Sequence, residues 1–153
     1  MSELRQNINT SMKTAMKAKD DVSLSTIRLI NAAIKERDIN ARSSKGQDGI
    51  SDDDVLSLLQ SMIKQRQDSI KIYNEGGRAE LAEREEEEIK VIQGFLPAQL
   101  SDDEVQDAVA GLIADVGAES IKDMGKVMAA LKTQYAGKLD MARASAVVKE
   151  KLG

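Results

Sequence analysis

Lysines between residues 122 and 138 are the side chains of this chain best suited to contact phosphate groups. Lys122 and Lys126 are four positions apart, so both project from one face of a short helix. Lys138 follows Gly137, and the pair predicts a basic turn after that helix. Ammonium groups placed in this way can neutralise a phosphate backbone. The other face of the helix carries an apolar stripe at i, i+3, i+4 and i+7, made of Met124, Val127, Met128 and Leu131.

A second basic row is expected on a helix of the N-terminal half. Arg28, Lys35 and Arg42 follow one another at intervals of seven residues, so they line up along one helix. Such a row could lie along a phosphate backbone. It could equally be ordinary solvent-facing charge, because Glu36 and Asp38 stand among these residues. The spacing leaves both interpretations open.

The residue types of most enzyme active sites are missing. The 153 residues include no Cys and no His. This excludes thiol nucleophiles, zinc fingers, and Ser-His or Cys-His arrangements. Acidic residues are abundant, but they fall at helix-capping positions or on polar faces, and Ser43, Ser44 and Lys45 form only a short polar segment. We therefore expect no catalytic residue, no metal site and no cofactor.

Two charged features of the middle third are expected to be structural. Arg66 falls on the apolar stripe of its helix, so we expect it to find a structural partner. The run Glu85–Glu88 is expected on a solvated helix face. Ion pairs at i, i+4 would stabilise that face. The expected pairs are Glu80–Arg84 and Glu86–Lys90.

Seven helices are needed to position these side chains, four longer ones and then three short ones. Only one proline is present, and aromatic residues make up 2% of the chain, which favours helices over sheets. The segment from Ala41 to Gly49 is the longest polar loop and the one expected to be mobile. The fourth helix is expected at about 78–93. The expected N-caps are Ser2, Asp20, Ser51, Ser101, Ser120 and Asp140.

A domain boundary is expected around Pro97, which cannot continue a helix and pushes Leu96 into an extended conformation. The apolar residues beside it predict a docked hinge at residues 95–100. The expected organisation is all-α, with an N-terminal domain of about four helices at residues 1–94 and a three-helix C-terminal domain at residues 101–153.

The net charge of −4 argues against a strong general nucleic-acid binder, and no DNA partner is expected. No apolar run approaches the length of about 18 residues that a membrane span requires. The first residues do not resemble a signal peptide. From these features we expect a cytoplasmic protein without a membrane partner.

Four blocks of the sequence, in order, resemble the GatB/YqeY family. These blocks cover residues 28–35, 63–70, 95–100 and 123–128. The family includes stand-alone YqeY-like proteins and the tail domain of the B subunit of the glutamine-dependent tRNA amidotransferase. One departure lies after Gly137-Lys138, where family members often read Ala-Asp-Gly and this chain reads Leu139-Asp140-Met141.

The resemblance implies a C-terminal three-helix tail domain and a role in handling tRNA. It also implies the activity with which the family is labelled, a carbon–nitrogen ligase with glutamine as amido donor. This chain, however, has no counterpart of the catalytic subunits. The leading hypothesis is a non-catalytic accessory protein that binds tRNA or a tRNA–enzyme complex. The candidate contacts are Lys122, Lys126, Lys138, Arg28 and Lys35. The alternative is a protein–protein adaptor that uses an apolar groove between the tail helices and binds no RNA, while an independent amidotransferase is disfavoured.

Overall fold

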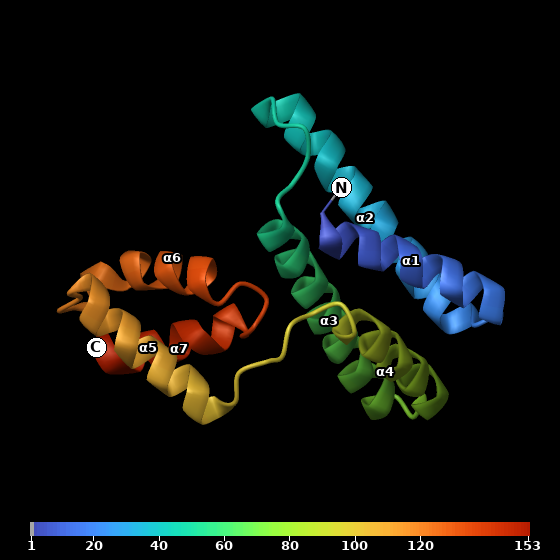
Figure 1. Ribbon diagram of the computed structural model, residues 1–153. Coiled ribbons are helices and arrows are strands. Elements are labelled where there is room, and N and C mark those ends of the chain that lie inside the picture. Colours follow the sequence, from blue (N-terminus) through green and yellow to red (C-terminus); the bar gives the residue numbers. More distant parts are fainter. Residues whose placement is uncertain (1) are drawn as a thin grey trace. The chain divides into compact units, whose positions relative to one another are not determined.

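The computed structural model describes residues 2–153 and confirms the expected all-α fold, with no strand in that range (Figure 1). The chain divides into two compact units, of which the first ends at Leu96 and the second begins at Pro97. The first unit contains α1 (Glu3–Ala18), α2 (Asp21–Lys45), α3 (Asp52–Glu75) and α4 (Ala79–Gln93). The second contains α5 (Asp102–Val116), the 3₁₀ turn η1 (Ile121–Asp123), α6 (Met124–Gln134) and α7 (Met141–Leu152).

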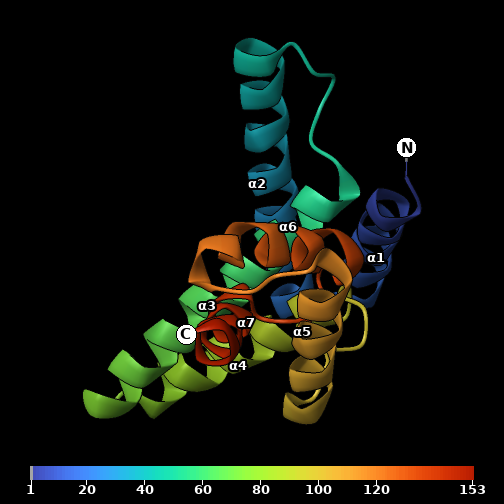
Figure 2. The same cartoon turned by 90° about the vertical axis from the view of Figure 1, so that its left-hand side faces the viewer.

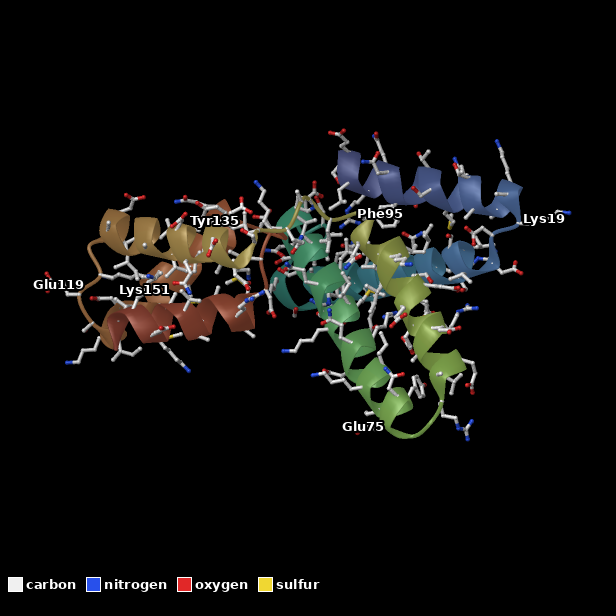
Figure 3. The ribbon with its side chains drawn as sticks, turned by 90° about the horizontal axis from the view of Figure 1, so that it is seen from below. Lys19, Glu75, Phe95, Glu119, Tyr135 and Lys151 are labelled. Carbon is white, nitrogen blue, oxygen red and sulfur yellow. The ribbon has the colours of Figure 1, made fainter. Side chains whose placement is uncertain are left out.

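Three of the four helices of the first unit begin at the N-caps that the sequence predicts, whereas Arg78 before α4 makes no side-chain cap bond. Ser2, Asp20 and Ser51 each accept a hydrogen bond from a backbone N–H in the first turn of the helix that follows. Such a bond satisfies one of the amide groups that have no partner within the helix. Figure 3 marks two turns of this unit, with Lys19 between α1 and α2 and Glu75 at the end of α3.

Apolar stripes from all four helices form the core of the first unit. Each fully buried aliphatic side chain stabilises the fold by about 1.5–3 kcal/mol relative to an exposed one. The largest fully buried residues are Ile8, Ile27, Ile30, Val55, Leu59 and Ile92.

The prediction of a mobile loop from Ala41 to Gly49 is wrong for most of that segment. Helix α2 continues to Lys45 and ends at Gly46, which adopts the left-handed conformation with φ 65°. Two serine hydroxyls in its last turns donate to backbone carbonyl oxygens four residues earlier, so they are compatible with the helix. The short connection that remains is also held, since Arg42 Nε donates to the carbonyl oxygen of Asp48 at 2.7 Å.

The second unit has a core of its own. Ser101 and Glu104 form the complete capping box that the sequence predicts for α5. Asp140 caps α7 by accepting from the N–H of Ala142. The most deeply buried residues of this unit are Val109, Val127, Leu131, Ala144 and Val148.

Residues of the expected hinge belong to both units. Phe95 and Leu96 pack against the first core, and Leu100 packs against the second. Residues 97–100 have no regular secondary structure. The hinge at 95–100, with independent domains on either side, stays a prediction.

Candidate nucleic-acid interface

The turn between α6 and α7 holds Lys138 firmly by its backbone. Gly137 adopts the left-handed conformation, with φ 73°. Its carbonyl oxygen accepts a hydrogen bond of 2.6 Å from Gln99 Nε2, and the carbonyl oxygen of Lys138 accepts one of 2.7 Å from the N–H of Leu100. The N–H of Lys138 donates to Tyr135, the C-cap residue of α6 that Figure 3 labels. The Lys138 side chain is exposed, so the turn presents its ammonium group from a fixed backbone.

Lys122 and Lys126 lie at the other end of α6. The expectation of one helix carrying both is wrong in detail, because Lys122 belongs to η1 and α6 begins only at Met124. The expected cap of the sixth helix is also wrong: Ser120 caps the 3₁₀ turn by accepting from the N–H of Lys122 at 3.3 Å, and α6 itself has no side-chain cap bond. Both lysine side chains are exposed.

Asp123 is the acidic neighbour of these lysines. Its carboxylate accepts a 2.9 Å hydrogen bond from the backbone N–H of Glu119. That bond and the nearby charge of Lys126 lower the pKa of Asp123. Part of the positive charge at this end of α6 is therefore already balanced.

The structure brings Lys122 and Lys126 to one end of α6 and places Lys138 beyond the opposite end. The helix axis between Lys126 and Gln134 is about 12 Å long at 1.5 Å per residue. The three lysines thus bracket α6 and do not form a single cluster. An elongated ligand such as a nucleic-acid backbone could reach both ends, while a small anion could not.

Arg28 and Lys35 belong to the first unit, where both are exposed on α2. Seven helical residues separate their backbones by about 10 Å. Arg42, the third member of the row, donates a hydrogen bond from Nε to the carbonyl oxygen of Asp48. All three side chains are exposed, and Arg42 differs from Arg28 and Lys35 in also holding the backbone of the connection that follows α2.

Arg66 has the structural partners that the sequence predicts. Its Nε atom lies 3.5 Å from Glu88 and 3.8 Å from Glu85, and its Nη1 donates to the carbonyl oxygen of Met62 at 3.1 Å. The run Glu85–Glu88 is therefore not wholly a solvated face, because its first and last members turn toward α3. Arg84 lies 3.9 Å from Glu88, instead of the expected pair with Glu80.

Burial and the charge of Glu88 raise the pKa of Glu85, although Arg66 opposes the effect. Within residues 2–153, no group of three or more acidic residues is placed to hold a metal ion. None of the helices formed by residues 2–153 contains an apolar stretch of the length that a membrane crossing needs. The expectations of no catalytic residue and no cofactor stay predictions.

The fold and the basic turn define a class of small helical proteins with two units, the second of which is a three-helix tail. The sequence model of the Yqey-like protein family matches residues 5–152, and the chain belongs to this family. The resemblance that the sequence blocks indicate is thereby confirmed.

Several fungal relatives carry the name "Altered inheritance of mitochondria protein 41, mitochondrial". The relative from Lachancea thermotolerans is 37% identical over 113 residues, which cover 72% of this chain and 58% of the relative. The one from Vanderwaltozyma polyspora is 36% identical over 89 residues, covering 58% and 46%. The one from Pyrenophora tritici-repentis is 35% identical over 133 residues, covering 82% and 69%. The chain spans about half the length of the first two of these relatives.

The relatives correct the expected location. Their names place them in mitochondria, which contradicts the cytoplasmic location expected for this chain. The physical reason for the error is that the amino-acid composition of a folded helical domain does not determine the compartment to which the protein is sent. Targeting information lies in separate segments that are read before or during import.

Proposed function

We propose that this chain is an accessory protein that binds tRNA, or a complex of tRNA with an enzyme, and performs no catalysis by itself. The observation that carries the proposal is the Gly137-Lys138 turn, whose backbone is fixed by Gln99 and Leu100 while the lysine side chain stays exposed. Because the backbone of the turn is already fixed, only the lysine side chain loses freedom when its ammonium group meets a phosphate. The resemblance to the amidotransferase tail domain supports tRNA as the source of that phosphate.

Lysines at both ends of α6 suit contacts to two separate phosphates. Each phosphate contact releases condensed counterions, and losing one contact lowers the slope of log affinity against log salt by about 0.7–0.9. Such contacts carry no base identity. We therefore expect affinity for different tRNA species to be similar and to fall steeply with salt.

The test is a titration of fluorescently labelled bulk tRNA at several salt concentrations. Replacing Lys126 and Lys138 together by Ala should lower the salt slope by about 1.4–1.8 and nearly abolish binding at moderate salt. The matched control replaces Lys149 and Lys151, two exposed lysines of α7, and should have little effect. Circular dichroism should show that both double variants keep their helical content.

Two outcomes would reject this proposal. If both double variants lose affinity equally, the interaction is diffuse charge attraction. If neither loses affinity, the tail does not bind RNA through these lysines. The second candidate function, a protein–protein adaptor, would then be preferred. The net charge of −4 favours an adaptor, and so does the apolar side chain of Ile121, which is 48% exposed beside Lys122.

A further inference from the structure

An open groove runs between α2 and α3 within the first unit. It has a volume of about 450 Å³. Figure 2 shows the C-terminal half of α2 rising clear of α3 and α4, so the two helices that form the groove diverge toward that end of α2. The residues on which the argument depends are Leu29, Ala33 and Arg37 from α2, and Leu58, Met62 and Arg66 from α3.

The floor of the groove is apolar and reaches the surface. Leu58 and Met62 are nearly buried, at 5% and 7% exposure, whereas Leu29 is 49% exposed. Leu29 thus extends the buried apolar side chains to the surface of the groove, where it can serve as an apolar contact for a partner. Solvated phosphates gain nothing from such a floor, so the groove is better suited to a protein partner than to RNA.

The length of the groove matches two to three turns of a helix. Its lining residues extend from Leu29 to Asn40 on α2, about 16 Å of axis, and from Leu58 to Arg66 on α3, about 12 Å. Apolar side chains at i, i+3 or i+4, and i+7 of an α-helix span about 10 Å. A helix with that stripe would therefore place all its anchors within the groove.

Charge on the walls specifies the partner further. Arg37 and Arg66 line the groove together with one carboxylate, that of Glu36. Arg37 is exposed and has no ion pair with any of residues 2–153. Arg66 Nε is buried without a hydrogen-bond partner in the same range, even though two carboxylates lie nearby on α4. Glu85 and Glu88 offset the charge of Arg66, so Arg37 is the wall cation that remains to pair with an acidic side chain of a partner.

We propose that the groove between α2 and α3 binds an amphipathic helix of a partner protein. The apolar stripe of that helix packs on Leu29, Leu58 and Met62, and an acidic residue beside the stripe meets Arg37. This surface is distinct from the basic turn of the tail unit and goes beyond the proposed tRNA-binding function. A protein with both surfaces would connect a helical protein partner to an RNA.

The test uses a phage-displayed library of helical peptides, about 16 residues long, selected on the full chain. We expect enrichment of sequences with apolar residues at i, i+3 or i+4, and i+7 and an acidic residue flanking the stripe. Selection on the Arg37→Glu variant should enrich a basic residue at that flanking position. Such a swap reports charge pairing across the groove, which general stickiness would not produce.

Binding of a selected peptide, synthesised with a fluorophore, then locates the site. Leu29→Glu should weaken the binding roughly tenfold or more, as expected for loss of an apolar anchor. Ile72→Glu is the matched control, because Ile72 is a more exposed apolar residue of α3, at 66%, that does not line the groove. Helical content and melting temperature should be the same for both variants.

The proposal is overturned if the selection enriches no helical pattern, or if Leu29→Glu and Ile72→Glu weaken binding equally. It is also overturned if labelled tRNA displaces the peptide and Leu29→Glu abolishes tRNA binding, since the groove would then be an RNA surface. Failure of the tRNA proposal is seen separately, through Lys126 and Lys138 of the tail unit, so the two proposals can fail independently.

Discussion

Asp38 holds three segments of the N-terminal unit together. Its two carboxylate oxygens accept hydrogen bonds of 2.9 Å from Arg5 Nη1 and Nη2, and Oδ1 also accepts one of 2.8 Å from the N–H of Ile50. Arg5 Nη2 donates to the carbonyl oxygen of Ile50 as well. Gly49 makes this approach possible, because a Cβ there would lie 2.7 Å from Asp38 Oδ1. One partly buried ion pair therefore fixes α1, α2 and the segment that leads into α3.

We expect Asp38→Asn to lower the free energy of unfolding by about 1–3 kcal/mol, because it weakens several charge-assisted hydrogen bonds. Urea denaturation would measure the change. The control is Asp68→Asn, an exposed aspartate of α3, and should have almost no effect. Equal losses for the two variants would contradict this role of Asp38.

The effect of Asp38→Asn should depend on pH. The hydrogen bond from Arg5 is the main cause of the lowered pKa of Asp38. The folded pKa therefore lies below the unfolded value of about 3.9, so the stabilisation is present above pH 4. It is lost as the pH falls through the folded pKa, and the two proteins should then converge in stability. A difference that stays constant from pH 7 to pH 2 would argue against the ion pair.

Replacing Glu85 or Glu88 by Gln should change the free energy of unfolding in different ways. Glu88 lies closer to Arg66, so Glu88→Gln should lower the free energy of unfolding by about 1–2 kcal/mol. Glu85→Gln should be neutral or slightly stabilising at pH 7, because burial and Glu88 raise the pKa of Glu85. A raised folded pKa means that lowering the pH stabilises the native protein, and Glu85→Gln should remove this gain. Thermal melts of both variants across pH 4–7 would test the contrast.

At the scale of elements, most helix starts could be predicted from sequence because a cap depends on neighbouring residues; the start of α6 could not, since Ser120 caps the 3₁₀ turn before it. Ser2, Ser51 and Ser101 bond to amide groups only three residues away. The end of α2 could not be predicted in this way. Its last turns look like a polar loop, and they are held by serine hydroxyls bonded within the helix and by a connection tied back to Arg42.

The candidate sites show the same division between local and long-range information. Spacing alone identified the exposed lysines on either side of α6, but not their separation by the length of that helix. The groove between α2 and α3 was missed entirely, because it depends on how two helices diverge in space. Leu29 lies off the buried stripe of α2, and a single exposed leucine carries no sequence signal of this opening.

Two glycines at the ends of α6 should respond in opposite ways to the same substitution. Gly137→Ala should cost about 1 kcal/mol, because φ of 73° is strained for a residue with a Cβ. Gly125→Ala should stabilise the tail unit by about 0.5–1 kcal/mol, because Gly125 is helical and a Cβ there would meet nothing within 4 Å. Chemical denaturation would measure both values. A loss of stability in both variants would contradict the prediction for Gly125, because it would mean that helical propensity does not decide the effect at that position.

At the scale of the whole molecule, each unit buries its own apolar residues. The core of the first includes Phe95 and Leu96, and that of the second begins with Leu100. The tail unit is also closed on itself, since Gln99 and Leu100 bond to the turn at Gly137 and Lys138. The residues before α5 thus complete the tail and are more than a connection.

We expect residues 97–153, produced alone, to fold cooperatively, because they include both the core and the segment that closes it. A domain of about 60 residues buries roughly 60% of the surface that its unfolded chain exposes, so its stability should be modest. Circular dichroism should show a helical spectrum and a sigmoidal melt. A fragment that begins at residue 101 is the matched comparison, and it should melt at a lower temperature because it lacks the hydrogen bonds from Gln99 and Leu100. A gradual melt for both fragments would mean that the tail folds only with the rest of the chain, and equal melting temperatures would mean that residues 97–100 contribute nothing to it.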